Sequence, residues 1–536
     1  MTTLNGSELL VKALEAQGAE KIFSIPGGQL MAAYEAIRTS PNLELIVPRQ
    51  EGAGALMACG YALSRADPGV VISTVGAGVI YELAGLIYAW EERIPLISIA
   101  PQVQSWRIKP IQENLQAIDQ DELYAPITKF HSIMYHYDRI PQLVARAYKI
   151  ALAPEPGPVH LDLPMDIAFQ KKSLSRSRMK TMIPAADKTR FIGKQAADPK
   201  EMQKAIRLIR EAKRPLAFLG RMLARSADGR KALEQFLAKT KIPALSSGPA
   251  FSALSGKNAF FLGTVDLYEN EQSFELISQS DLLLFLEPDE EIINFYRKIS
   301  PRLSSSPVIQ LSSYPLLFNS FALISSALAG SPELILEQIA EELAPQADPE
   351  RNQWLEKLCQ DRSRIFQMTQ AGLIEPRQKD LRHSLEIINR VLKQGDFVVC
   401  EGREIVSSAK LYLENYQAGK VIFLPENVPA GAGFPLSLGI KAGSNQSRVF
   451  LLTDRKNFKY HCRELQTEVR YQMGICTLVF PDQEILAETE PDLKALAQSF
   501  GVKGFSIQEP VEEINEKLLG EAVELESGSL LEIRGF

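Results

Sequence analysis

The sequence predicts an α/β protein in which three doubly wound α/β domains follow one another along the chain. Two observations support this prediction. The chain has 536 residues, more than one hydrophobic core can serve, and a domain usually takes about 150. Helical and strand patterns also alternate in three successive blocks, and strands joined by helices at this pitch form a mostly parallel sheet with helices on both faces.

The predicted divisions follow changes in composition and periodicity. We expect domains at 1–170, 196–345 and 376–536, separated by linkers at 171–195 and 346–375. The first linker is polar and basic without periodicity, which is typical of a surface connection. The second has a mixed helical pattern. The first eighteen residues, MTTLNGSELLVKALEAQG, have the pattern of an N-capped amphipathic helix and not of a signal peptide.

Composition excludes several classes of function. Apolar residues make up 45% and charged residues 23% of the chain, the proportions of an ordinary globular protein. A net charge of −6 gives no electrostatic basis for binding nucleic acid or a membrane surface. The sequence has no apolar run long enough to span a bilayer, so we expect a cytoplasmic protein with small molecules or other proteins as partners. The five cysteines form no CxxC pair, which argues against a zinc site and a disulfide framework.

The stretch from Phe450 to Gln483 has the order strand, turn, helix, strand, and we interpret it as a βαβ unit. Asp454 and Asp482 follow its two strands, and a right-handed crossover would place them side by side. Two carboxylates so placed suit a hard cation such as Mg²⁺ beside a diphosphate. The alternative is that both acids are simply good turn formers.

The first block carries five motifs in a characteristic order. These are Pro26-Gly27-Gly28, Pro48-Arg49-Gln50-Glu51-Gly52, Ser73-Thr74-Val75-Gly76-Ala77-Gly78, Ile94-Pro95-Leu96 and Gly157-Pro158-Val159-His160-Leu161-Asp162-Leu163-Pro164. They closely resemble the pyrimidine-binding domain of the acetolactate-synthase-like thiamine diphosphate enzymes. The second block resembles the central, Rossmann-like domain of that family, and the third resembles its diphosphate-binding domain.

The resemblance implies a cofactor, a partner and a substrate class. In that family thiamine diphosphate and Mg²⁺ lie between the pyrimidine domain of one subunit and the diphosphate domain of another, so we expect a homodimer or homotetramer. The implied substrate is a 2-oxo acid. FAD is not expected, because the second block lacks the family's arginine-containing strand end, and its acidic stretch 287–291 would repel a dinucleotide.

Six positions on the pyrimidine side are candidate contacts. Glu51 falls on the family's activating glutamate, which hydrogen-bonds the aminopyrimidine and helps generate the thiazolium ylid. The alternative is that Glu51 caps a helix beginning at Gly52. Gln112 falls in a loop that faces the substrate channel in the family, or is an exposed loop residue. Ser73 and Thr74 offer hydroxyls to a ligand, or belong to an ordinary strand-to-helix turn. Pro26 and Gly27 belong to the same cofactor side.

The third block departs from the family where the diphosphate and metal should bind. Thr453, Asp454 and Arg455 stand where the family has glycine, aspartate, glycine, and Pro481-Asp482 stands where it has paired asparagines. Arg455 puts a long side chain where phosphates should approach the backbone. We favour the interpretation that it closes the old site; the alternative is that Arg455 or Lys456 contacts the diphosphate directly.

Two further departures lie earlier in that block. Charged residues flank Gly402 and Arg403 where the family has a glycine-rich phosphate turn, and Ala432 stands where a bulky apolar residue bends the cofactor. The connection from Gln483 to Pro491 is also short, whereas the family has a longer segment that closes over the active site.

Three hypotheses remain open at this stage. The preferred one is a family member that has lost ordinary cofactor chemistry or depends on a paralogous partner subunit. The second is an active but divergent 2-oxo-acid decarboxylase or carboligase, with Glu51 as activator and Asp454 and Asp482 on Mg²⁺. The third is a binder of another anion through Arg403, Arg455 and Lys456.

Overall fold

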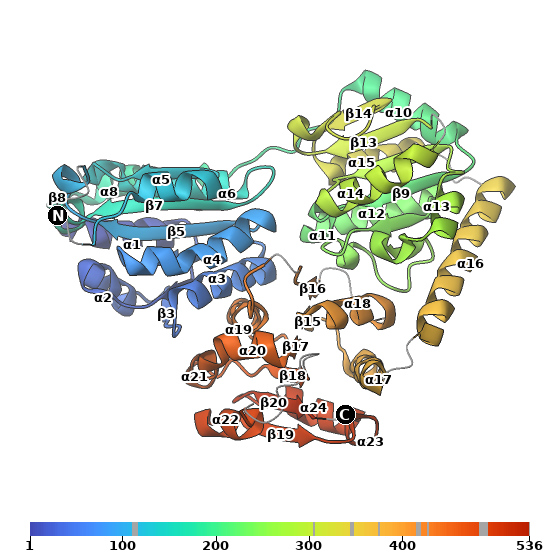
Figure 1. Ribbon diagram of the computed structural model, residues 1–536. Helices are drawn as coiled ribbons and strands as arrows, with labels where there is room; N and C mark the ends of the chain where they lie inside the picture. The colour runs from blue at the N-terminus through green and yellow to red at the C-terminus, as the bar shows by residue number, and fades with distance from the viewer. Residues whose placement is uncertain are drawn as a thin grey trace. The chain divides into compact units, whose positions relative to one another are not determined.

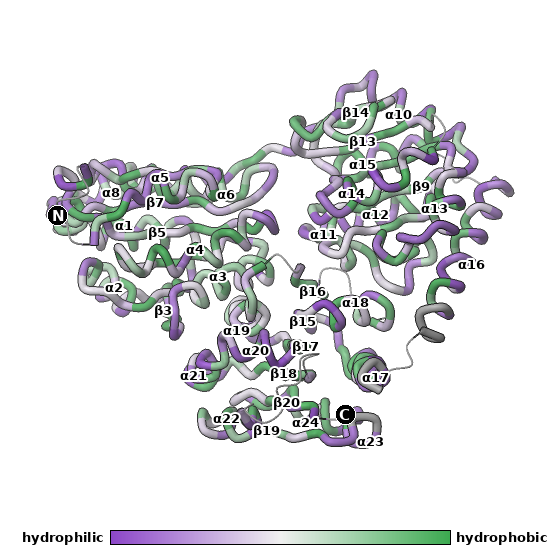
Figure 2. Tube along the Cα trace, in the orientation of Figure 1, coloured by the Kyte–Doolittle hydropathy of each residue, from purple (hydrophilic) through white to green (hydrophobic). Residues whose placement is uncertain are grey.

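Three six-stranded sheets, each with its own helices, confirm the prediction of three α/β domains in series (Figure 1). The computed structural model describes residues 1–109, 116–303, 306–343, 348–372, 376–413, 420–425, 428–481 and 491–534. The chain divides into two compact units. The first holds Met1–Ile192, Leu424–Ser506 and Ala522–Glu532, and the second holds Gly193–Phe423, Ile507–Glu521 and Ile533–Phe536. Figure 2 shows hydrophobic residues gathered inside the domains and hydrophilic residues on outer helices and turns.

The first domain is a parallel sheet with the strand order β3-β2-β4-β5-β7-β6. Its strands are β2 (Lys21–Ser24), β3 (Glu44–Ile46), β4 (Gly69–Ile72), β5 (Leu96–Gln102), β6 (Phe130–Ile133) and β7 (Pro158–Pro164). Its helices are α1 (Gly6–Ala16), α2 (Met31–Thr39), α3 (Glu51–Arg65), α4 (Ala77–Glu91), α5 (Gln120–Tyr124), α6 (Ile140–Leu152) and α7 (Met165–Phe169). Asn5 and Glu8 form a reciprocal capping box at the start of α1, which confirms the predicted N-capped helix.

Alternation along the strands separates two faces of this sheet. Ile97 and Ile99 of β5, with Val159 and Leu161 of β7, join the hydrophobic core packed by α1 and α6. Successive side chains on a strand point to opposite faces. The intervening residue Ser98 therefore points to the other face, where α4 packs on β5 and β7.

The segment predicted as a surface linker without periodicity, 171–195, contains regular structure. β8 (Lys171–Leu174) pairs antiparallel with β1 (Thr2–Asn5), and α8 (Arg176–Met182) and α9 (Ala186–Thr189) follow it. The hydroxyls of Thr3 and Ser173 are also hydrogen-bonded across the pair, at 2.8 Å. Periodicity could not reveal this strand, because only one of its four residues is buried and its partner lies far away in the sequence.

The central domain has the strand order β11-β10-β9-β12-β13-β14. Its strands are β9 (Pro215–Leu219), β10 (Ala244–Ser246), β11 (Phe261–Thr264), β12 (Leu282–Leu286), β13 (Val308–Ser312) and β14 (Ser326–Ala329). Its helices are α10 (Pro199–Glu211), α11 (Met222–Arg225), α12 (Ala227–Thr240), α13 (Glu271–Ile277), α14 (Glu290–Ile299), α15 (Pro332–Glu342) and α16 (Pro349–Gly372). Helix α16 packs on this domain through Trp354, whose indole N–H donates to the carbonyl of Pro215 at 2.9 Å.

The third sheet has the strand order β16-β15-β17-β18-β20-β19. Its strands are β15 (Phe397–Cys400), β16 (Val421–Phe423), β17 (Val449–Asp454), β18 (Cys476–Phe480), β19 (Lys503–Ile507) and β20 (Ser529–Ile533). Its helices are α17 (Pro376–Val391), α18 (Arg403–Tyr412), α19 (Gly433–Gly443), α20 (Arg455–His461), α21 (Leu465–Arg470), α22 (Leu493–Phe500), α23 (Pro510–Glu513) and α24 (Glu516–Val523). β17 and β18 are parallel neighbours with helices between them, which confirms the predicted βαβ unit.

Within the first compact unit, α3 and α19 pack closely through glycines. A Cβ at Gly60 would clash with the carbonyl of Leu436, and one at Gly439 would clash with the carbonyl of Met57. The two backbones therefore touch. In the part of the chain that the structure describes, no helix combines the length and apolarity needed to cross a membrane.

Candidate functional site

The pyrimidine-side candidates gather at the carboxyl ends of β2 and β4. Glu51 is the first residue of α3, and the cap is Gln50, whose side-chain oxygen accepts from the backbone N–H of Ala53 at 3.0 Å. The alternative that Glu51 caps a helix starting at Gly52 is therefore wrong, because the helix begins one residue earlier. Gln50 does the capping and leaves the Glu51 carboxylate at the first turn, where the helix dipole favours an acid.

Gly27, Thr74 and Glu51 meet around Gly78. A Cβ at Gly27 would clash with the methyl group of Thr74, so these two turns touch. A Cβ at Gly78 would lie 2.5 Å from the Thr74 hydroxyl oxygen and 3.4 Å from Oε1 of Glu51. Glycines at 27 and 78 thus leave room beside the Glu51 carboxylate. Pro26 precedes this contact directly.

Ser73 and its neighbour Thr74 differ in burial. Its side chain is fully buried, whereas Thr74 is partly exposed at the turn. Gln112, the predicted substrate-channel residue, lies outside the described residues. The first sheet therefore brings together Gly27, Glu51 and Thr74 and turns Ser73 inward.

The segment leading to Glu51 is held by two residues of the third block in the same compact unit. The backbone N–H of Arg49 donates to both carboxylate oxygens of Glu464, at 2.9 and 3.1 Å. The hydroxyl of Tyr471 accepts from the N–H of Val47 at 2.9 Å and donates to the carbonyl of Leu45 at 3.1 Å. Burial raises the pKa of Glu464 to about 7, a shift that the Thr467 hydroxyl and the Arg49 N–H reduce.

Sequence reasoning missed Glu464 and Tyr471 as positioning residues. Their partners lie more than 400 positions away in the chain, and no local pattern reports such a contact. The one available signal was an acid and a tyrosine at the two ends of a short amphipathic helix.

On the diphosphate side, Asp454 caps α20. One carboxylate oxygen accepts from the backbone N–H of Asn457 at 2.8 Å, and the other accepts from the Asn457 side-chain amide at 2.9 Å. The amide oxygen of Asn457 in turn accepts from the N–H of Gly431 at 3.2 Å. A carboxylate thus occupies the helix N-terminus that a phosphate group would need.

Arg455 points away from that turn. Its guanidinium pairs with the fully buried carboxylate of Glu532 on β20 and donates to the carbonyl of Pro491 at 2.7 Å. Lys456 is exposed, and Thr453 is fully buried. Ala432 is also fully buried, next to the start of α19. Asp482, the second predicted metal ligand, lies outside the described residues.

In the second compact unit, Gly402 precedes α18 with a φ of 101°, a backbone conformation that favours glycine, and Arg403 is the first residue of that helix. Among the described residues no group of three His, Cys, Asp or Glu side chains is arranged to hold a metal ion. All five cysteines are free thiols.

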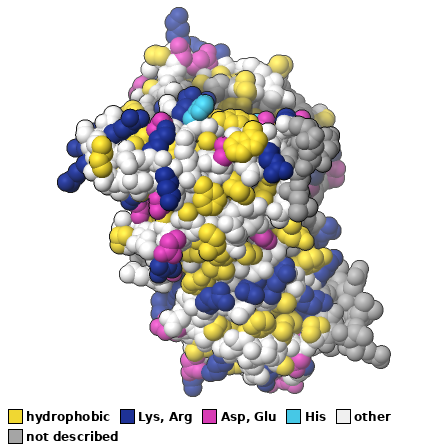
Figure 3. All heavy atoms as spheres, turned by 90° about the vertical axis from the view of Figure 1, so that its left-hand side faces the viewer, with side chains coloured by type: hydrophobic (Ala, Val, Ile, Leu, Met, Phe, Trp, Pro, Cys, Tyr) yellow, Lys and Arg dark blue, Asp and Glu magenta, His cyan; other side chains and the backbone are white. Residues whose placement is uncertain are grey.

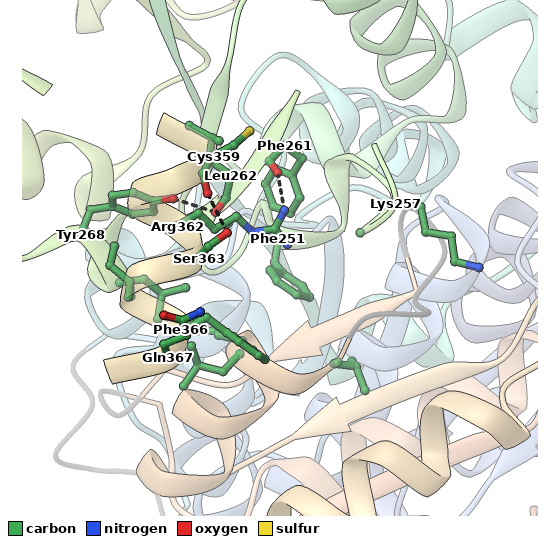
Figure 4. A pocket seen from close by; sticks show the side chains of 17 residues that line it. Phe251, Lys257, Phe261, Leu262, Tyr268, Cys359, Arg362, Ser363, Phe366 and Gln367 are labelled. Atoms are coloured by element: carbon green, nitrogen blue, oxygen red, sulfur yellow. Dashed lines mark hydrogen bonds between the residues drawn. The ribbon is translucent and has the colours of Figure 1, made fainter. Parts of the chain in front are cut away.

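A separate cavity of about 610 Å³ lies in the second compact unit, against β11, α16 and α18 (Figure 4). Its wall is largely apolar, with Phe251, Leu262 and Phe366 among the lining residues. Arg362 lines it as well, and its guanidinium donates to the carbonyl of Phe261 at 3.2 Å. Sequence reasoning assigned no role to these positions.

Comparison with known proteins agrees with this architecture. Residues 4–123 match the family "Thiamine pyrophosphate enzyme, N-terminal TPP binding domain", and residues 202–339 match "Thiamine pyrophosphate enzyme, central domain". The probable acetolactate synthase large subunit of Methanococcus aeolicus is 25% identical, covering 99% of this chain and 92% of its own. The acetolactate synthase large subunit of Haemophilus influenzae is 26% identical over 97% of this chain and 92% of its own.

Three parallel-sheet domains in this order define the three-domain class of thiamine diphosphate proteins. Within that class, the chain is similar to acetolactate synthase large subunits over nearly its whole length.

Proposed function

We propose that this chain is a family member whose pyrimidine side is retained and whose own diphosphate side no longer receives the cofactor. The observation that supports this proposal is the hydrogen bonding of the turn at Asp454. Both carboxylate oxygens of Asp454 accept hydrogen bonds from Asn457, and Arg455 is paired with Glu532. Thr453 and Arg455 replace the two glycines that flank this aspartate in the family, and the backbone N–H of Asn457 is already bonded to Asp454. The residues present therefore do not fit the diphosphate.

The preserved pyrimidine side points to a role within an assembly. The family's site is composite, and several relatives are named as large subunits. An apolar stripe on α4 supports self-association: Ile80, Tyr81 and Ile87 are 49%, 55% and 37% exposed. Figure 3 shows apolar side chains exposed between groups of Lys and Arg on one face of the molecule. We infer a homodimer or homotetramer, or a mixed assembly in which Glu51 serves a paralogous subunit with an intact diphosphate side.

The second candidate is an active, divergent enzyme acting on 2-oxo acids. The grouping of Gly27, Glu51 and Thr74 around Gly78 favours this candidate. The glycines leave room beside the Glu51 carboxylate, which is the acid that activation of the cofactor would need. The turn at Asp454 speaks against it. Cofactor binding by the isolated protein separates the two candidates.

The decisive experiment is calorimetric titration of the purified protein with thiamine diphosphate and Mg²⁺. We expect no heat of binding at micromolar cofactor, and micromolar affinity would overturn the proposal. The matched variant carries Thr453→Gly and Arg455→Gly, which restore the family's small residues. Binding gained by this variant and absent from the native chain would show that Thr453 and Arg455 prevent cofactor binding in the native chain.

We also propose that the central domain holds no FAD. In an open parallel sheet a dinucleotide binds at the carboxyl ends of the strands where the order reverses, here between β9 and β12. There the carboxylate of Asp289 accepts from the N–H of Arg221 at 3.0 Å and from the Ser247 hydroxyl at 2.6 Å. A Cβ at Gly220 would clash with the carbonyl of Glu287. Visible absorbance of the purified protein after incubation with FAD and desalting tests this, and a retained flavin spectrum would contradict it.

A further inference from the structure

A group of polar side chains lies buried between the first sheet and α4. Ser98 of β5, with His160 and Asp162 of β7, belongs to the sheet face opposite the apolar core of α1 and α6. These three residues are at most 2% exposed, and Glu82 of α4 is fully buried on the same side. An acid in the middle of an otherwise apolar helix needs a physical explanation.

Three of these residues form a hydrogen-bonded chain. The Ser98 hydroxyl lies 2.7 Å from Nδ1 of His160, and Nε2 of His160 lies 3.1 Å from Oδ1 of Asp162. With the Asp162 carboxylate as acceptor, Nε2 carries the hydrogen and Nδ1 accepts from Ser98. The ring of Tyr124, from α5, stacks on the imidazole at a centroid distance of 3.5 Å. The chain therefore holds the imidazole in one orientation.

Beside this chain lie polar atoms that make no hydrogen bond within the described residues. They are both carboxyl oxygens of Glu82, the Ser73 hydroxyl and the Tyr124 hydroxyl. Leaving a buried polar atom unpaired costs about 1–3 kcal/mol, so native proteins usually supply a partner, often an internal water. Ser73 and Ser98 lie close enough to both Glu82 and Tyr124 to influence their ionisation. Glu82 and Tyr124 therefore lie beside the same two serines.

Electrostatics favours the neutral form of Glu82. Burial raises the pKa of Glu82 to about 7; the charge of His160 and the hydroxyls of Ser73 and Ser98 oppose this shift, and the charge of Glu51 adds to it. The other charged group nearby is Asp162, whose own pKa burial also raises. Beyond it lie Asp121 and His131, 3.2 Å apart and partly exposed.

Glu82 also lies behind the candidate site. Gly78 and Glu82 are four residues apart on α4, so they share one face of the helix. The Glu51 carboxylate lies next to Gly78. Any negative charge gained by Glu82 would therefore develop about one helical turn from Glu51.

We propose that Ser73, Glu82 and Tyr124 enclose an internal water site, in which Glu82 stands as a protonated carboxylic acid behind Glu51. The ligands of this site are water and a proton. The water accepts from or donates to the three unpaired side chains, and the Ser98–His160–Asp162 chain forms one wall. This inference goes beyond the proposed function and does not depend on it, because every residue of the water site belongs to the first domain.

Infrared difference spectroscopy tests the protonation state directly. A protonated carboxylic acid has a carbonyl stretch above the amide I band, and a carboxylate does not. At pH 6 the spectrum of the native chain minus that of Glu82→Gln should contain this band, which should vanish from the same difference at pH 8.5. The control, Glu122→Gln, changes an exposed acid on α5 and should give no such band. An ionised Glu82 at pH 6, seen as a missing band, would overturn the proposal.

A thermal measurement provides the second test. The folded state holds a proton on Glu82 that the unfolded chain releases, so this stabilisation is complete below about pH 4.5 and is lost as the pH rises through about 7. Glu82→Gln imitates the neutral acid, so its melting temperature should match the native value at pH 5 and exceed it by a few degrees at pH 8. A melting temperature of Glu82→Gln that lies below the native value by the same amount at both pH values would count against the proposal. If Glu82→Gln fails to fold, the acid band is followed in a pH titration of Glu464→Gln, which lacks the other carboxyl group whose pKa burial raises to about 7. No band lost between pH 6 and pH 8.5 would overturn the proposal.

Discussion

The guanidinium of Arg455 pairs with the carboxylate of Glu532, which is fully buried two strands away on β20. The same carboxylate accepts from the backbone N–H groups of Leu493 and Lys494, at 3.4 and 3.2 Å, at the start of α22. One ion pair therefore joins α20, β20 and α22. It also holds the Arg455 side chain away from the turn at Asp454, and we expect the ion pair to matter for stability.

Arg455→Met should destabilise the protein by about 3 kcal/mol, because it leaves a buried carboxylate without its counter-charge. Urea unfolding followed by circular dichroism measures this. Arg455→Met combined with Glu532→Gln removes the charge as well and should recover part of the loss. Lys456→Met, at the exposed neighbouring position, should change stability by less than about 0.5 kcal/mol. An Arg455 effect no larger than that of Lys456 would show that the pair contributes little.

Glu464 should make stability fall as the pH rises. Its folded pKa of about 7 lies above its ordinary value of 4.5, so the folded state binds a proton more tightly than the unfolded chain does. The stabilisation is complete below pH 4.5 and lost by pH 8, with an expected size of about 1–3 kcal/mol. Glu464→Gln should unfold with a smaller difference between pH 5 and pH 8 than the native chain. The exposed control Glu211→Gln should keep the native difference.

His461 should make stability fall as the pH decreases, the opposite direction to Glu464. Burial and the nearby Arg463 lower its pKa to about 4, from an ordinary 6.5. Its stabilisation is therefore present above pH 6.5 and lost as the pH falls through 4. His461→Gln should reduce the loss of melting temperature between pH 6.5 and pH 4. If His461→Gln lost as much melting temperature between pH 6.5 and pH 4 as the native chain does, His461 would not be the source of this pH dependence.

A side chain at either of two glycines should disrupt the packing of α3 on α19. Gly60→Ala and Gly439→Ala each place a Cβ against a backbone carbonyl of the opposite helix, and overpacking of this kind costs about 1–3 kcal/mol. Gly520→Ala is the matched control, since nothing lies within 4 Å of its added Cβ, and it should be neutral or slightly stabilising. Melting temperatures of the three variants compare these effects. Equal values would mean that the helices separate easily.

The exposed stripe on α4 should govern self-association. Ile80→Glu combined with Ile87→Glu places two charges on it and should lower the mass measured by sedimentation equilibrium. Leu323→Glu is the control, because this leucine is 91% exposed and belongs to the central domain, whereas the stripe belongs to the first. A native chain that sediments as a monomer would remove the basis of this prediction.

Much of the architecture was predictable because it depends on local periodicity. The alternation of apolar strands and amphipathic helices indicated the three sheets, and the N-capped pattern of the first eighteen residues indicated the first helix. The exposed strand β8 escaped notice, since its ladder to β1 is formed by backbone groups 170 positions apart along the chain. The candidate site was predictable only in part. Motif order located Glu51 and Asp454, but it does not predict which groups they hydrogen-bond.

What the sequence determined by itself is the succession of three α/β domains, the family resemblance and the residues at the two sheet edges. Only the tertiary structure decided what those residues contact. It turned Ser73 inward and Thr74 outward, tied Arg455 to Glu532, and placed Glu464 under the segment before Glu51. The physical reason is the difference in range. Strand and helix patterns arise from neighbours a few residues apart, whereas an ion pair or a buried hydrogen bond depends on chain segments that meet only after the sheets have formed.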